Sequence, residues 1–200
     1  DNATSIGETV SLVVPVAWQD EEASEEILNK IKMKLGRVEN LDGSVVDYSD
    51  ELENAFSLSE YYDVASYGNH SITSIMTDWY YAPYDFSVMQ NVSSTDEEFM
   101  TGLTSWVYET YSDLDWSRLD ADDDGFIDSL IIINNGTTDD ELNMNTFDYA
   151  IHYSPRYTGE NAGTLDKPSF KNYITMNHLF LDGNTIIHEY AHRFGIVDYY

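Results

Sequence analysis

The chain has 200 residues, and 42% of them are hydrophobic, which is enough apolar material to bury the core of one globular domain. Its 37 acidic and 9 basic residues give a formal net charge of -28, which argues against nucleic acid or anionic lipid as a partner, because both would be repelled. No apolar run approaches the roughly 20 residues of a membrane span. Because there are no cysteines, the fold must be stabilised by its core rather than by disulfides, and bound metals are a candidate for further stabilisation.

A buried strand and an amphipathic helix are predicted near the N-terminus. Residues 10–18 form an almost continuous apolar run, which predicts a strand buried on both faces. Pro15 lies inside this run and predicts that the strand is interrupted or lies near a sheet edge, because proline has no N–H to donate. A helix is predicted over residues 24–35, with acidic residues in its first turn, lysines toward its end and Gly36 as the stop.

Two capping boxes begin the next two predicted helices. Ser57 and Glu60 begin a short helix that continues through an aromatic segment, and a strand is predicted directly after it at residues 71–73. Thr95 and Glu98 begin a longer helix, whose apolar residues recur at helical spacing and predict a face packed on a sheet. These apolar residues are Phe99, Leu103, Trp106, Val107, Tyr111 and Leu114.

An acidic loop follows the long helix, and its spacing is typical of a calcium site. Residues 120–128 read Asp-Ala-Asp-Asp-Asp-Gly-Phe-Ile-Asp, and the glycine permits the sharp turn that directs several oxygens toward one Ca²⁺ ion. Ile131 stands where an EF-hand would need a bidentate Glu, so a buried strand at residues 129–134 is predicted to follow instead. The alternative is an acidic turn without an ion, in which the carboxylates would repel one another. The predicted ligands are the carboxylates of Asp120, Asp122, Asp124 and Asp128 and the carbonyl oxygen of Phe126.

The segment between this loop and the C-terminal motif is predicted to contain two strands, at residues 147–153 and 173–180, separated by a loop. The histidines outside the motif, His70, His152 and His178, are interpreted as ordinary surface or core residues. We see no internal repeat, low-complexity tract or linker, so the chain is predicted to form one domain over residues 1–200.

The C-terminal motif His-Glu-x-x-His-x-x-Gly-x-x-Asp carries the strongest chemical signal in the chain. His188 and His192 lie one helical turn apart, so both imidazoles can reach a single metal ion, for which zinc is the best candidate. Gly195 can adopt the left-handed conformation that ends a helix, which brings Asp198 back as a third ligand. Glu189 is then placed beside a water in the fourth coordination position, where it can act as a general base. A bare His-Glu-x-x-His can arise by chance, but five positions in register favour the metal site.

This motif resembles the metzincin clan of zinc peptidases, with Asp198 in place of the third histidine that most members carry. Within the clan it is most similar to the immune inhibitor A family of secreted bacterial metallopeptidases, which ends its motif in Gly-x-x-Asp-x-Tyr, matched here by Gly195, Asp198 and Tyr200. That family often has Pro before the Asp, where this chain has Val197. Residues 57–73 and the acidic loop are also similar to stretches of the same family.

The resemblance implies an α+β fold of the zincin or metzincin type, in which a mixed twisted β-sheet packs with helices and the C-terminal helix binds zinc in the active site. It also implies that the strand at residues 173–180 lies at the sheet edge and pairs with extended substrate, and that the protein is secreted by a bacterium.

The domain is expected to be incomplete. Metzincins continue into a lower subdomain with a Met-containing turn, and no Met follows the motif here. We therefore expect residues 1–200 to be the upper subdomain of a truncated metallopeptidase catalytic domain, with further domains in the same chain. The start at Asp1 without a signal peptide is interpreted as a processed or trimmed form.

Two functional hypotheses follow. The first is a zinc-dependent endopeptidase that hydrolyses protein or peptide substrates: a zinc-activated water attacks the scissile carbonyl, Glu189 takes its proton and passes it to the leaving amine, and Tyr200 is a candidate to assist the oxyanion. Its cofactors would be Zn²⁺ and Ca²⁺. The alternative is a catalytically weak or inactive, calcium-stabilised zincin-like module for binding or adhesion. The missing lower subdomain favours the module, and the intact Glu189 favours the enzyme.

Overall fold

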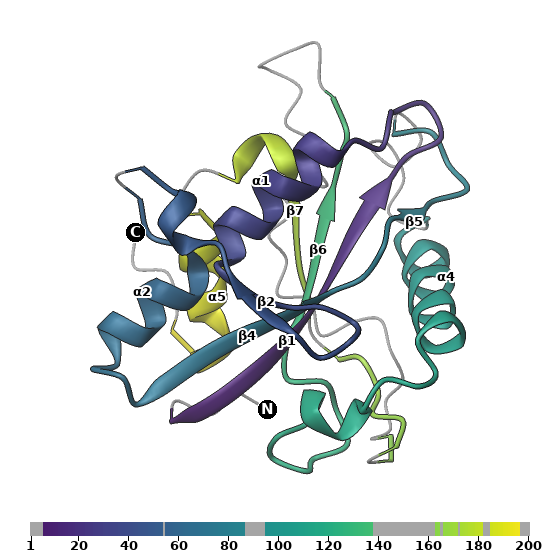
Figure 1. Cartoon of the computed structure of the whole chain (residues 1–200). Coiled ribbons are helices and arrows are strands. Elements are labelled where there is room, and N and C mark those ends of the chain that lie inside the picture. The colour runs from purple at the N-terminus through teal and green to yellow at the C-terminus, as the bar shows by residue number, and fades with distance from the viewer. Residues whose placement is uncertain are drawn as a thin grey trace.

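The computed structural model describes residues 6–53, 55–86, 95–137, 163–164, 166–171, 173–181 and 185–196. Over these ranges the chain forms a seven-stranded sheet with helices on both faces (Figure 1). The strands are β1 (Gly7–Ala17), β2 (Arg37–Glu39), β3 (Val45–Asp47), β4 (His70–Met76), β5 (Tyr80–Tyr81), β6 (Leu130–Asn134) and β7 (Ile174–Asn177). The helices are α1 (Glu25–Leu35), α2 (Leu58–Ala65), α4 (Thr95–Thr110) and α5 (Thr185–Ala191), with 3-10 turns η1 (Ser49–Glu51), η2 (Trp116–Leu119), η3 (His178–Phe180) and η4 (His192–Phe194).

The sheet is mixed and mostly parallel. The described strands follow the order β3-β2-β4-β1-β6-β7, and β5 pairs with the end of β1. β2 and β3 run antiparallel, while the other described pairs are parallel. The prediction of an α+β fold in which a mixed sheet packs with helices is therefore confirmed at this level.

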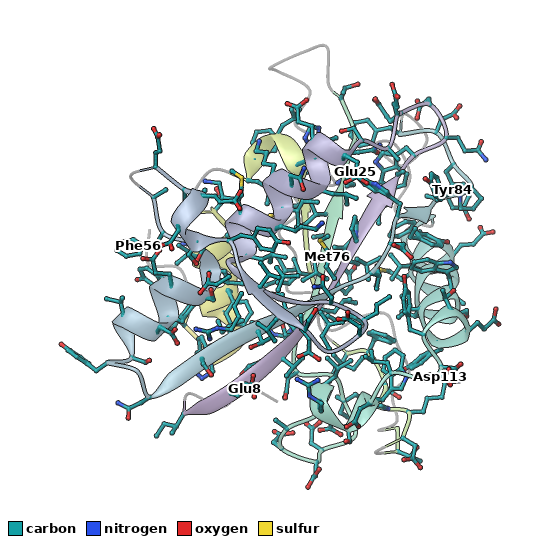
Figure 2. All side chains as sticks on the ribbon, in the orientation of Figure 1. Glu8, Glu25, Phe56, Met76, Tyr84 and Asp113 are labelled. Atoms are coloured by element: carbon teal, nitrogen blue, oxygen red, sulfur yellow. The ribbon has the colours of Figure 1, made fainter. Side chains whose placement is uncertain are left out.

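β1 is the central strand, and it is continuous. It pairs with β4 on one side and β6 on the other, so the expectation that Pro15 interrupts the strand or places it near an edge is wrong. The backbone of odd-numbered residues such as Val13 faces β4, and Val13 lies opposite Met76. Met76 is the last residue of β4 and is labelled in Figure 2. β5 joins β1 only from Val16 onward. Pro15 thus lies in the gap between β4 and β5, where its missing N–H leaves no ladder partner unsatisfied.

Alternation along β1 and β6 divides the core into two clusters, one on each face of the sheet. The first cluster lies under α4, and the second lies under α1, α2 and α5, as the arrangement in Figure 1 shows. The α4 side includes Leu12, Val14, Leu130 and Ile132 from the sheet and Phe99, Leu103, Val107 and Tyr111 from the helix and its end, which confirms the predicted inner face of that helix. The other side includes Val13, Ile131, Ile133, Ile31, Leu58, Ile186 and Tyr190.

The helix starts agree with the sequence, whereas one strand is shorter than predicted. The hydroxyl oxygen of Ser24 accepts from the backbone N–H of Ile27, and that of Ser57 accepts from Glu60, each over 3.2 Å. The predicted strand at residues 173–180 ends at Asn177, where the chain turns into η3, and residues 147–153 lie outside the described residues. Among the described helices, none combines the length and the apolar character that a membrane crossing requires.

Candidate metal centre

The C-terminal motif lies on α5 and η4, and apolar residues fix this segment to the sheet. Ile186 and Ile187 are buried in the cluster under α5, as expected for a helix anchored from below. The Tyr62 hydroxyl of α2 donates a 2.9 Å hydrogen bond to the backbone carbonyl of Ile187. Because one side of α5 is held in this way, the opposite side, which carries His188, faces solvent.

The structure brings three side chains of the motif together. The Nε2 atoms of His188 and His192 each lie 3.5 Å from one oxygen of the Glu189 carboxylate. Ligand atoms of the three residues all lie within 4.8 Å of one another, so the group could hold a metal ion. The side chain of His188 is 46% exposed and that of Glu189 only 9%. The site is therefore open to solvent on one side, and its carboxylate lies on the buried side.

The second histidine is held in one tautomer by the backbone. Its Nδ1 lies 2.7 Å from the carbonyl oxygen of Ile196, and because a carbonyl only accepts, Nδ1 must carry the hydrogen. In the neutral ring the lone pair is then on Nε2, which is the atom nearest Glu189 and the one that a metal would bind. Gly195 makes this contact possible: its left-handed backbone (φ 75°, ψ 14°) ends the helix as predicted and turns the carbonyl of Ile196 back toward the ring.

Polar groups of the sheet lie beneath the motif helix. Tyr190 is fully buried, and its hydroxyl lies 3.4 Å from the Ser11 Oγ of β1. Ser11 in turn donates to the Ser129 Oγ over 2.9 Å. Since Ser11 has only one proton to give, the Tyr190 hydroxyl is the donor in the first contact. Burial raises the pKa of Tyr190, so the phenol keeps the proton that this contact needs.

A half-buried carboxyl of the acidic loop is influenced electrostatically by a charge of the motif segment. Arg193 directly follows the second histidine and is only 3% exposed. Its positive charge lies close enough to Asp128 to act on that carboxyl: burial raises the pKa of Asp128 to about 6, and Arg193 opposes this rise. The Asp128 carboxylate also accepts a 2.8 Å hydrogen bond from the backbone N–H of Ala121. This bond joins the two ends of the acidic loop.

In the acidic loop, the structure gathers three of the four predicted carboxylates. Oxygens of Asp120, Asp122 and Asp124 lie within 4.8 Å of one another, and Asp128 is not part of this group. Asp120 is fully buried, and its carboxylate accepts from the backbone N–H groups of Asp124 and Gly125 at 3.0 and 2.9 Å. The backbone N–H of Phe126 donates to Asp124, and Phe126 forms a bridge with Ser169. Backbone N–H groups of the loop therefore hydrogen-bond to the loop's own carboxylates and hold it in a turn. The loop leads into the buried strand β6, as predicted.

The remaining predicted residues fall into two groups. Asp198 and Tyr200 lie outside the described residues, so the third ligand and the oxyanion role stay predictions. His70 and His178 do not belong to the metal group of the described residues. His70 is buried against the rings of Tyr62 and Phe194, and burial lowers its pKa.

The sequence analysis found the residues of the motif itself. It missed the distant residues that hold the motif in position. Tyr62 and Ser11 contact α5 from parts of the chain more than 60 residues away. One signal was present: Ser11 stands inside an apolar strand, and a hydroxyl buried in a sheet needs a polar partner.

Comparison of the sequence with models of known protein families gives no match, and comparison with curated proteins gives none either. The functional assignment therefore depends on the residues of the site.

Proposed function

We propose that the protein is a zinc-dependent endopeptidase with a zincin-like fold, resembling the immune inhibitor A family of secreted bacterial peptidases. The observation that carries the proposal is the convergence of two imidazole Nε2 atoms on one carboxylate, each over 3.5 Å, with the Nδ1–H of His192 held by a backbone carbonyl. Two imidazoles beside a carboxylate in a site open on one side match the donor set of hydrolytic zinc centres. The resemblance to secreted peptidases supports an extracellular location.

His188 and His192 would hold the metal, with Asp198 as the third ligand. When bound, zinc would supply Lewis-acid activation of a water molecule and polarisation of a substrate carbonyl. Glu189 is the general base: its carboxylate, desolvated and beside both Nε2 atoms, would accept a proton from the water and deliver it to the leaving amine. The Nδ1–H contact to Ile196 keeps the His192 ring oriented and leaves Nε2 as the nitrogen that can bind a metal. The substrate would be a protein or peptide.

We also propose that the acidic loop binds Ca²⁺ as a structural ion. This proposal is supported by three carboxylates gathered in a turn that begins next to η2 and ends at β6, and by the oxygen-only donor set that Ca²⁺ prefers. Asp128 and the Phe126 carbonyl would complete the ligand set that the spacing predicts. Calcium would then stabilise the loop that leads into β6.

The alternative function is a zincin-like module for binding or adhesion that holds metal without useful turnover. The 46% exposure of the His188 side chain favours this alternative, because peptidase sites exclude water from the reacting groups. A buried carboxylate between both imidazoles favours the enzyme, since a binding module does not need a base at that position.

The test replaces Glu189 with Gln, and Glu25→Gln on the exposed surface of α1 (Figure 2) serves as the matched control. We expect wild type and both variants to contain zinc by elemental analysis. Hydrolysis of casein or a peptide library should be inhibited by phenanthroline in the wild type, unchanged in Glu25→Gln, and reduced at least about 100-fold in Glu189→Gln, because general acid-base catalysis contributes this much or more. Zinc content without wild-type hydrolysis would favour the binding module. Undiminished hydrolysis by Glu189→Gln would refute the role given to this residue.

A further inference from the structure

Phe194 lies among three other aromatic rings, and it ends η4, the turn that begins with His192. The centroid of its ring is 5.3 Å from those of Tyr62 and His70 and 5.8 Å from that of Tyr190. At these separations aromatic rings attract one another beyond the effect of the area they bury. The four rings form an aromatic cluster to which α2, β4, α5 and η4 each contribute one residue.

His70 takes part in this cluster as a ring and not as a hydrogen-bonding group. It is 2% exposed, and among the described residues neither of its nitrogens has a hydrogen-bond partner. Its ring is nearly perpendicular to those of Phe194 and Tyr62, at 87° and 84°. Burial lowers its pKa, so the imidazole is uncharged at neutral pH. What His70 contributes is therefore a flat, uncharged ring packed against Phe194.

Tyr62 connects the aromatic cluster to the first part of the motif. Its hydroxyl donates over 2.9 Å to the carbonyl of Ile187, the residue before His188. Its ring centroid lies 5.3 Å from that of Tyr190 and 5.3 Å from that of Phe194. Accordingly, α2 lies beside α5 in Figure 1. One side chain of α2 thus contacts the motif segment both before the first histidine and after the second.

Two hydrogen bonds of His192 enclose Phe194. The backbone N–H of Gly195 donates to the His192 carbonyl over 3.0 Å, and the His192 Nδ1 lies 2.7 Å from the Ile196 carbonyl. Both bonds start at His192 and end beyond Phe194, so they close a tight turn that contains it. A rotation of this turn would move the Phe194 ring and the His192 imidazole together. The Nε2 of that imidazole is the atom that lies 3.5 Å from the Glu189 carboxylate.

We propose that Phe194 is a positioning residue for the metal pair: its ring, held in the aromatic cluster, fixes the turn that directs the imidazole of His192. This inference rests on the proposed function in taking His188 and His192 as ligands, and it assigns Phe194 no contact with a metal or a substrate. The alternative is that Phe194 only adds apolar contact to the core. Loss of the ring would then lower stability alone, whereas a positioning role also requires a change in metal binding.

The test measures metal affinity and the visible spectrum of bound Co²⁺, at one neutral pH, with Zn²⁺ and Co²⁺ as probes. Phe194→Leu removes the ring and keeps an apolar side chain. His70→Leu removes the neighbouring ring without changing the motif, and His70→Phe keeps a ring at that position. The matched control is Phe99→Leu in α4, on the other face of the sheet. Phe99 is 1% exposed and lies 5.5 and 6.0 Å from the ring centroids of Trp18 and Tyr80.

We expect Phe194→Leu and His70→Leu to weaken Zn²⁺ binding about tenfold, the lower end of the loss seen when a group that orients a metal ligand is removed. Both should also shift the Co²⁺ spectrum, because that spectrum follows ligand geometry. His70→Phe should keep the affinity and the spectrum of the wild type. Phe99→Leu should lower the urea midpoint and change neither. If Phe194→Leu does not fold, the two His70 variants decide the question.

The outcomes separate this inference from the proposed function. Wild-type affinity and spectrum in Phe194→Leu and His70→Leu would overturn the positioning role, and so would an equal loss of affinity in Phe99→Leu or in His70→Phe. The proposed function stands in each of these cases, since the wild type binds zinc. A wild type that binds both metals but hydrolyses no substrate contradicts the peptidase proposal alone. If it binds neither metal, both proposals fail.

Discussion

At the scale of single residues, the hydrogen bond between His192 and the Ile196 carbonyl depends on a backbone conformation that favours glycine. Gly195 has φ 75° and ψ 14°, and a side chain in this left-handed region costs about 1–2 kcal/mol. We predict that Gly195→Ala lowers the free energy of unfolding by that amount in urea. It should also weaken Zn²⁺ binding, because a shifted Ile196 carbonyl no longer fixes the imidazole tautomer.

The control for this prediction is Gly43→Ala, in the turn between β2 and β3. Gly43 has φ 81° with open space where a Cβ would lie, so the substitution carries the same backbone strain away from the motif. It should lower stability by a similar amount and leave Zn²⁺ affinity unchanged. Equal affinity in both variants would show that the Ile196 carbonyl does not orient His192.

His178 provides a pH prediction at the same scale. It borders a cavity of about 700 Å³ lined also by Lys30 and other α1 residues. Burial, and then the charge of Lys30, lowers its pKa to about 4. Between pH 6.5 and 4 the unfolded chain therefore binds a proton at His178 that the folded chain does not. The stability that the neutral imidazole contributes is complete above pH 6.5 and is lost as the pH falls toward 4.

We expect His178→Gln to become more stable relative to the wild type as the pH falls from 7 to 4.5. The change should be about 1 kcal/mol, since solvent screening reduces the full effect of a partly exposed group. Urea unfolding of both proteins at several pH values measures it, and the difference between them removes the contribution of the other histidines. A difference that stays constant across this range would contradict the assigned titration.

At the scale of elements, α5 depends on α2 for its position. The Tyr62 hydroxyl donates to the Ile187 carbonyl over 2.9 Å in a buried setting, and a buried hydrogen bond of this kind contributes about 1 kcal/mol. Tyr62→Phe should lower the unfolding free energy by about this amount and speed hydrogen exchange in α5. Tyr61→Phe is the control, because Tyr61 is 38% exposed on the same helix and its hydroxyl loss should change neither. If hydrogen exchange in α5 is unchanged in Tyr62→Phe, the stability of α5 does not depend on its hydrogen bond to α2.

The elements also show where sequence reasoning succeeds. Local patterns predicted the helix starts at Ser24 and Ser57 correctly, because a cap is formed by residues only three apart. The close approach of His188, Glu189 and His192 follows from helical periodicity in the same way. The prediction from Pro15 was wrong, because a local pattern in β1 cannot show where its neighbour β4 ends and where β5 begins.

The contacts that fix the motif could not be read from the chain for the same reason. Tyr62 and Ile187 are 125 residues apart, and Ser11 and Tyr190 are 179 apart. No local spacing relates such residues, and their meeting follows only from the strand order that brings β1 and β6 under α5. The sequence thus predicted that His188, Glu189 and His192 come together, and it gave no information on the distant residues that support them.

At the scale of the whole molecule, the net charge of -28 opposes the folded state, because like charges are closer together in it than in the unfolded chain. Salt screens this repulsion, so NaCl should raise the urea midpoint. A general screening effect must therefore be separated from binding at the acidic loop. Comparison at matched ionic strength does this, since a bound ion adds stability according to its concentration and dissociation constant.

We predict that CaCl₂ raises the free energy of unfolding above the value in NaCl of the same ionic strength, by about 2.7 kcal/mol when Ca²⁺ is present at 100 times its dissociation constant. Asp122→Asn should lose most of this calcium-specific increment, because it removes one charge from the loop while its amide oxygen still accepts the contact from the Asp124 N–H, 3.3 Å in the wild type. Asp113→Asn removes a charge from an equally exposed residue just beyond the end of α4 (Figure 2) and should keep the increment. If Ca²⁺ and Na⁺ stabilise the wild type equally, the loop is an acidic turn held by its own backbone donors, and charge screening accounts for the whole effect of salt.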